Sequence, residues 1–223
     1  MTAFVLIPGM LHGGWWFRPL TDGLRAAGHE VYPLTLTGVA ERGHLNNGTV
    51  NLDTHIQDVV SVLEAEQLTD VVLVAHSYGG MVASGAADRV PERIASLLYA
   101  DAFVPRDGES AYGIVDEVWK QRYLAGASAD GLTTAGRNPA LDPRAGVHPL
   151  ASLLQSITLT GALDAVTRRT YLHASAFEES PLLETFARLS EDPTWTVITL
   201  PFGHDLIREA PEEFLKAALA AAG

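Results

Sequence analysis

The stretch VVLVAHSYGGMVA at residues 71–83 decides the fold of this 223-residue chain. Its first five residues are apolar at successive positions, which is typical of a strand buried on both faces of a parallel sheet. A short turn centred on Ser77 follows, and the small residues beyond it open a helix. A buried strand that leads through a tight turn into a helix is one unit of an α/β fold.

The turn has the form of a nucleophile elbow, in which a serine hydroxyl is lifted above the carboxyl edge of the sheet. The usual motif has glycine two residues before and two residues after the serine, and here these positions hold Ala75 and Gly79. Ser77 is therefore the candidate nucleophile, and the backbone N–H of Tyr78 is a candidate donor to an oxyanion. The alternative interpretation is a serine and glycine turn of an ordinary doubly wound domain.

The alternation of strand and helix continues on both sides of this stretch. Further strands are expected at residues 4–7, 30–36, 94–100 and 194–200. Helices are expected at residues 16–27, 53–67 and 211–222, the last with proline in its first turn. This order predicts βαβ units and a mostly parallel, doubly wound sheet.

Composition excludes several classes of protein. Hydrophobic residues make up 47% of the chain and charged residues 19%, so a large core is expected rather than disorder. The net charge of −12 repels phosphate backbones and anionic lipids, so neither nucleic acid nor a membrane is expected as a partner. The absence of cysteine excludes a thiolate metal site and a cysteine nucleophile. No secretory start and no apolar run of ~18 to 20 residues are present, which favours a cytoplasmic protein.

A glycine-rich turn, PGMLHGGWW at residues 8–16, follows the first strand. Its spacing differs from GxGxxG, which argues against a dinucleotide site. Gly9 allows the chain to turn so that the Met10 N–H faces the same point as the Tyr78 N–H, giving two donors for an oxyanion. His12 is a candidate substrate-binding residue, although a histidine beside two glycines is also typical of one that fastens a loop by hydrogen bonds.

The segment LPFGHDL at residues 200–206 ends the last expected strand and carries His204. A loop at this point lies above the same sheet edge as Ser77, so His204 is the candidate general base. The alternative is a capping or surface histidine. The order serine, long insertion, histidine matches the triad order of α/β-hydrolases.

The sequence resembles the α/β-hydrolase superfamily, and within it the branch of plant salicylate-binding methyl esterases, hydroxynitrile lyases and their bacterial esterase relatives. The likeness is carried by PGMLHGGWWFRPL, TLTGVAERGHL, AHSYGG, DAFVP and GHDLIREAPEEF, and it runs over essentially the whole chain. It implies an α/β-hydrolase core at residues 1–104 and 171–223. A small helical cap, shorter than in the plant members, is expected at residues 105–170, after the strand that ends at Ala100.

Two positions depart from the hydroxynitrile lyases. These enzymes carry a threonine in the oxyanion loop and a lysine directly after the catalytic histidine, groups that bind the hydroxyl and the cyanide. This chain has Gly9 and Asp205 there. The resemblance therefore argues against lyase chemistry.

The triad acid departs as well, because the plant members carry it after the penultimate strand, where this chain aligns Phe177. Phenylalanine does not orient a histidine. Some α/β-hydrolases, including polyketide thioesterases, take the acid from the end of the preceding strand, and Asp101 stands there. Asp101 is the preferred acid; the alternatives are Glu178 or Glu179, no acid at all, or a turn-forming role for Asp101.

These observations predict a serine hydrolase that cleaves a small or medium hydrophobic carboxylic ester or thioester through Ser77, His204 and Asp101. No metal and no cofactor are expected, and the oligomeric state stays open, with a homodimer as one alternative. Aromatic and aliphatic cap residues are expected to wall an apolar pocket or to form the core of the cap: Trp119 and Tyr123, together with Tyr112, Leu150 and Leu153. The rival functions are a non-hydrolytic cyclase, decarboxylase or C–C bond-cleaving enzyme of secondary metabolism, and a ligand-binding receptor with a degraded site.

Overall fold

A computed structural model of the chain describes residues 1–135 and 142–223. Its main sheet has six strands in the order β2-β1-β3-β4-β7-β8, and every neighbouring pair is parallel. The strands are β1 (Ala3–Ile7), β2 (Glu30–Pro33), β3 (Val71–His76), β4 (Ile94–Ala100), β7 (Arg169–Ala174) and β8 (Trp195–Leu200). The predicted parallel, doubly wound sheet is confirmed.

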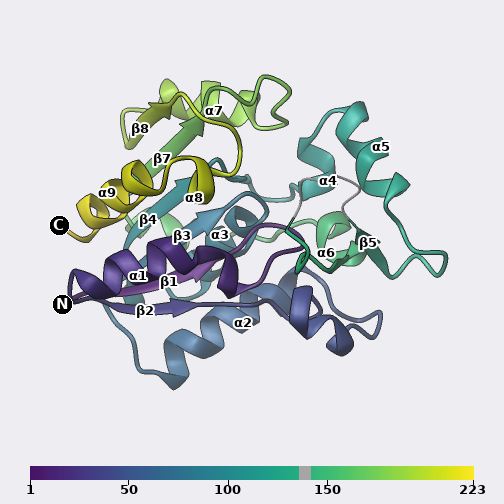
Figure 1. Cartoon of the computed structure of the whole chain (residues 1–223), viewed down its shortest axis with the longest axis horizontal. Coiled ribbons are helices and arrows are strands. Elements are labelled where there is room, and N and C mark those ends of the chain that lie inside the picture. The colour runs from purple at the N-terminus through teal and green to yellow at the C-terminus, as the bar shows by residue number, and fades with distance from the viewer. Residues whose placement is uncertain (136–141) are drawn as a thin grey trace.

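Helices cover both faces of the sheet. Alternate residues of each strand point to opposite faces, so each face carries its own apolar core, against which helices pack. Val5 and Leu73 belong to the core that contains α2 and α3, whereas Phe4 and Val72 belong to the core that contains α1 and α9. Figure 1 shows α1 and α9 side by side over the strands. The helices of these layers are α1 (Arg18–Ala26), α2 (Leu52–Ala65), α3 (Gly79–Arg89), α7 (Leu183–Ser190), α8 (Leu206–Glu209) and α9 (Pro211–Ala222). Short 3₁₀ helices lie at Gly14–Phe17, Ala40–Leu45, Pro91–Arg93 and Ala162–Ala165.

The expected element bounds differ from the observed ones mainly at β2, which ends at Pro33 instead of residue 36. The last backbone bond from this edge strand to β1, from the Leu34 N–H to the Leu6 carbonyl at 2.9 Å, comes directly after Pro33. Two residues later the Thr35 hydroxyl accepts from the Gly14 N–H at 2.8 Å and donates to Glu41 at 2.6 Å, which turns the chain away from the sheet. No helix in the part of the chain that the structure describes is long and apolar enough to cross a membrane.

The cap segment contains strands that the sequence analysis did not expect. Its elements are α4 (Ala111–Ile114), α5 (Glu117–Ala125), β5 (Thr133–Ala135), β6 (Val147–Pro149) and α6 (Leu150–Leu154). Antiparallel pairing of β5 with β6 makes a second, two-stranded sheet, which the sequence did not predict, beside the cap helices α4, α5 and α6. The expected cap range also includes residues 136–141, which lie outside the described residues, and its last two residues belong to β7. Figure 1 shows the cap elements gathered at the end of the molecule opposite the two termini.

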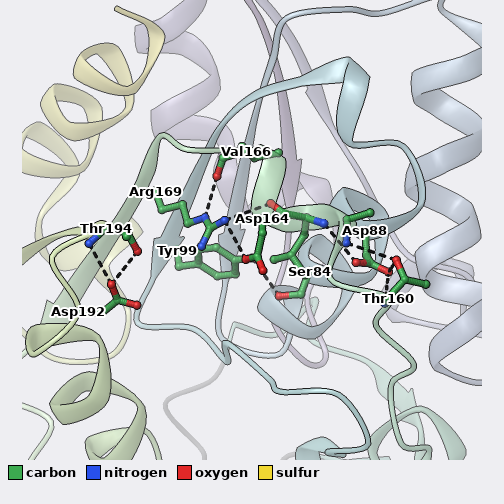
Figure 2. A network of polar contacts seen from close by, with 11 residues as sticks. Ser84, Asp88, Tyr99, Thr160, Asp164, Val166, Arg169, Asp192 and Thr194 are labelled. Atoms are coloured by element: carbon green, nitrogen blue, oxygen red, sulfur yellow. Dashed lines mark hydrogen bonds and ion pairs between the residues drawn. The ribbon is translucent and has the colours of Figure 1, made fainter.

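A network of polar contacts fixes the segment by which the chain returns from the cap to the sheet (Figure 2). Asp88 of α3 accepts from the N–H and the hydroxyl of Thr160, at 2.6 and 3.0 Å. Arg169 at the start of β7 donates to the Val166 carbonyl at 2.7 Å and to Asp164 at 3.0 Å. These bonds satisfy the backbone of an irregular connection and anchor it to α3 and β7.

Candidate active site

The strand order places two of the predicted loops at the point where the sheet changes winding direction. The chain passes from β1 outward to β2 and then returns to place β3 on the other side of β1. Loops that leave such neighbouring strands diverge and open a crevice at the carboxyl edge, where ligands of α/β proteins bind. Gly9 follows β1, and Ser77 follows β3.

These two loops are packed tightly against each other. A Cβ atom added at Gly9 would lie 2.9 Å from the Cβ of Ser77 and 3.0 Å from Nδ1 of His76. Only glycine fits without displacing the elbow. The glycine-rich loop is thus held directly beside the serine.

Ser77 has the backbone conformation of a sharp elbow, with φ of 52° in the left-handed region. Such a conformation is strained for a residue with a side chain and persists only where its surroundings fix it. Here the Ser77 N–H donates to the Ala100 carbonyl at 3.4 Å, and its carbonyl accepts from Phe103 at 3.0 Å and from Gly80 at 3.1 Å. A Cβ at Gly80 would lie 1.9 Å from the Phe103 carbonyl oxygen, so glycine is what lets α3 begin here.

The two amides predicted to bind an oxyanion are those of Met10, the residue after Gly9, and of Tyr78, the residue after Ser77. Over residues 1–135 and 142–223, neither the Met10 N–H nor the Tyr78 N–H donates to a protein acceptor. Tyr78 stands at the N-terminus of α3, where the first amides have no partner within the helix. Both donors are therefore available to a ligand oxygen.

Asp101 and His204 are brought together by the ends of β4 and β8. Asp101 is fully buried, has φ of 42°, and directly follows Ala100, the residue that pairs in register with His76. Its Oδ2 lies 2.5 Å from Nδ1 of His204, and its Oδ1 accepts from the Ala174 N–H at 3.4 Å. A carboxylate accepts only, so Nδ1 carries a proton, and Nε2 is the ring nitrogen that takes no part in this contact.

Two aromatic rings hold the His204 imidazole. The His76 ring lies 4.5 Å from it, and Nε2 of His76 donates to the His204 carbonyl at 2.9 Å. The Phe177 ring lies 5.1 Å away, so Phe177 packs against His204. The resemblance to the plant enzymes expects the triad acid at this position, where it would have to orient the same histidine. Burial holds the pKa of His76 well below its usual range, and His76 therefore stays neutral beside His204.

The alternative acids lie elsewhere. Glu178 and Glu179 are exposed, and Glu179 pairs with Arg122 of the cap at 2.9 Å. Asp205 is half-buried, and burial raises the pKa of its carboxyl. Arg208 lies 3.6 Å from its carboxylate. Among the carboxylates of the described residues, only Asp101 contacts a nitrogen of His204.

The predicted substrate-binding residues occupy three different environments. His12 donates from Nδ1 to the Met10 carbonyl at 2.7 Å, which fastens the glycine-rich loop. The Trp119 ring lies 6.0 Å from the Phe177 ring, and the Phe177 ring in turn lies beside His204. Tyr123 is buried in the core of the cap. Two cavities of about 390 and 380 Å³ open beside Trp15, and neither is lined by Ser77 or His204.

Sequence analysis missed two buried histidines close to the elbow, His55 of α2 and His148 of β6. Nδ1 of His55 lies 2.8 Å from the Tyr78 hydroxyl, and the His148 ring lies 4.6 Å from the Tyr78 ring. One signal was present, since His55 falls on the apolar face of its helix, three residues after Leu52 and four before Val59. The contact of His148 depends on the path of the cap and had no sequence signal.

These histidines make stability depend on pH. Burial lowers the pKa of His55 from 6.5 to about 4, and it holds the pKa of His148 well below its usual range. Because the folded state has the lower pKa, the unfolded chain binds more protons between pH 6.5 and 4, and stability falls as the pH falls through that window. His55 alone is expected to cost about 2 kcal/mol between pH 7 and pH 5.

Urea unfolding at pH 7 and pH 5 measures this loss. The variant His55→Asn should show a weaker pH dependence than the parent, and His44→Gln, which changes an exposed histidine, is the control. An unfolding free energy that stays constant or rises towards pH 5 would contradict the assignment.

Comparison with known proteins identifies the family. A model described as "Alpha/beta hydrolase family" matches residues 4–222. The carbendazim hydrolyzing esterase of Nocardioides sp. (strain SG-4G) is 38% identical, with 100% of both chains covered. Methyl jasmonate esterase 1 of Vitis vinifera is 32% identical over 60% of this chain and 51% of its own. The chain belongs to the alpha/beta hydrolase family.

Solved structures share this fold over nearly the whole chain. An extracellular alpha/beta-hydrolase from a Paenibacillus species superposes with a TM-score of 0.81 at 21% identity, with 99% of both chains covered. A pyrethroid hydrolase from Sphingobium faniae JZ-2 gives a TM-score of 0.76 at 19% identity, covering 99% of this chain and 97% of its own. At this level of identity the likeness establishes the fold.

Proposed function

We propose that the chain is a serine hydrolase that cleaves small or medium hydrophobic carboxylic esters through Ser77, His204 and Asp101. The observation that carries the proposal is the 2.5 Å contact between Nδ1 of His204 and the buried Asp101, built one strand away from the elbow of Ser77. The wider class is supported by relatives named as esterases, one of them 38% identical over its full length. The protein is a carboxylic ester hydrolase.

The geometry supports acyl transfer to water. Asp101 fixes the proton on Nδ1 of His204, so that Nε2 accepts the Ser77 proton as the oxygen attacks the ester carbonyl. The Met10 and Tyr78 amides donate to the oxyanion that develops. His204 then gives the proton to the departing alcohol, and a water molecule, activated in the same way, releases the acid from Ser77.

A fluorophosphonate probe tests the nucleophile independently of the substrate. We expect stoichiometric phosphonylation at Ser77, located by peptide mapping, and loss of all turnover of p-nitrophenyl acetate. An unmodified Ser77 in an active preparation would exclude the covalent mechanism. A panel of p-nitrophenyl esters of increasing chain length, methyl aryl esters, acyl thioesters and carbendazim then defines the acyl group, the last because of the substrate in a relative's name.

Hydroxynitrile cleavage is expected to be absent. A departing cyanide needs a positive group beside the histidine, and Asp205 instead places a carboxyl there. Mandelonitrile incubated with micromolar enzyme should release cyanide at the uncatalysed rate, while the same sample hydrolyses p-nitrophenyl acetate. Cyanide release that scales with enzyme concentration and disappears in Ser77→Ala would contradict this prediction.

A further inference from the structure

Tyr78 joins a proposed catalytic amide to a fully buried side chain. Its N–H is one of the two proposed oxyanion donors, and its side chain has no exposed surface. Because the residue follows the strained turn at Ser77, whatever holds the phenol also limits rotation of the peptide that carries the N–H. The phenol hydroxyl lies 2.8 Å from Nδ1 of His55, twenty-three positions earlier in the chain.

The protonation of His55 follows from its second partner. Nε2 of His55 lies 2.8 Å from the Thr37 carbonyl, which only accepts. Nε2 therefore carries the proton, Nδ1 is the acceptor, and the Tyr78 hydroxyl donates to it. The low pKa of His55 keeps the ring neutral and this arrangement intact at neutral pH.

The cap supplies another wall around the phenol. His148 of β6 lies edge-on to Tyr78, with the ring centroids 4.6 Å apart and the planes at 79°. Its Nε2 lies 2.9 Å from the Ser152 hydroxyl, which donates to the Pro149 carbonyl at 2.8 Å. His55 and His148 are both fully buried, so the Tyr78 ring is enclosed from the core and from the cap.

We infer that His55 is a positioning residue for the reaction: through the Tyr78 hydroxyl it holds the Tyr78 amide in the orientation that binds the oxyanion. This inference rests on the proposed function, since it assigns a task to the same site. A positioning role and a purely stabilising role predict different kinetics. Loosening the phenol should lower the rate of attack by Ser77, and substrate binding should stay the same.

Tyr78→Phe is the first test, because it removes the hydroxyl and keeps the ring. Removal of an oxyanion donor costs on the order of a hundredfold or more in kcat, and a misaligned donor costs less, so we expect a loss of roughly tenfold with KM unchanged. The rate of inactivation by a fluorophosphonate should fall by a similar factor, because its phosphoryl oxygen binds to the same amides. Tyr99→Phe, which removes another buried, hydrogen-bonded hydroxyl, is the control and should leave kcat unchanged.

Two nearly isosteric replacements of His55 then isolate the bond to Tyr78. His55→Asn and His55→Leu both lose the bond to Thr37, and only asparagine offers an acceptor to the phenol. The asparagine variant should keep kcat within about threefold of the parent, and the leucine variant should match Tyr78→Phe. All rates are measured well below the melting temperature of each variant.

The outcomes separate the inference from the proposed function. If Tyr78→Phe lowers the melting temperature but keeps the parental kcat and inactivation rate, the bond only stabilises the fold, and the positioning role is wrong. Equal kcat values for the asparagine and leucine variants would overturn it as well. If the parent protein is not phosphonylated at Ser77, the proposed function itself fails.

Discussion

Replacement of Ser77 by alanine is expected to lower ester turnover by about a thousandfold or more and to leave the fold intact. The rate falls because no covalent acyl-enzyme forms, and only the oxyanion donors and substrate binding remain. The fold survives because alanine tolerates the left-handed φ of 52° as well as serine does, and the bonds that fix the turn come from the backbone.

Turnover of a p-nitrophenyl ester, together with the melting temperature, checks this expectation. Ser175→Ala is a suitable control, because this serine lies on the exposed loop after β7 and its hydroxyl donates to the Leu200 carbonyl, away from Ser77 and His204 in sequence. It should keep full activity and full labelling by the fluorophosphonate. Retention of more than about a tenth of the activity by Ser77→Ala would exclude serine as the nucleophile.

The elements that place this serine were predictable from sequence, because their signals are local. Apolar runs identified β1, β3 and β4, and small residues after Ser77 marked the close approach of α3. In a parallel sheet the carboxyl ends of all strands meet at one edge, so residues that follow strand ends gather there whatever their distance in sequence. The choice of Asp101 among the residues at this edge came from the resemblance to α/β-hydrolases that carry the acid at the end of this strand, and its carboxylate lies 2.5 Å from His204.

The features that sequence analysis missed depend on contacts between distant segments. The hairpin of β5 and β6 has strands of three residues, too short to show alternation. His148 contacts Tyr78 because the cap folds back over the elbow. No local pattern in the sequence predicts a contact between segments so far apart in the chain. The places of Trp119 and Tyr123 could not be predicted from sequence for the same reason, since residues that line a pocket and residues that form the core of the cap have the same apolar character.

Asp101→Asn is expected to remove most of the activity at neutral pH, because asparagine no longer enforces the proton on Nδ1 of His204. An amide N–H donating to Nδ1 would select the wrong tautomer, and that substitution costs about ten-thousandfold in a serine protease. The loss here should exceed a hundredfold, with smaller losses for activated esters than for methyl esters.

The matched controls are Glu178→Gln and Glu179→Gln, the two carboxylates nearest to the position where the plant relatives are expected to carry the acid. Both are exposed, and Glu179 is paired with Arg122, so each change should alter kcat by less than about twofold. The order of the activity losses among the three variants decides which carboxylate is the triad acid. If Asp101→Asn were nearly silent and either glutamate variant inactive, the acid would belong to the loop after β7. The 2.5 Å contact between Asp101 and His204 would then serve only to fix the loop that follows β8.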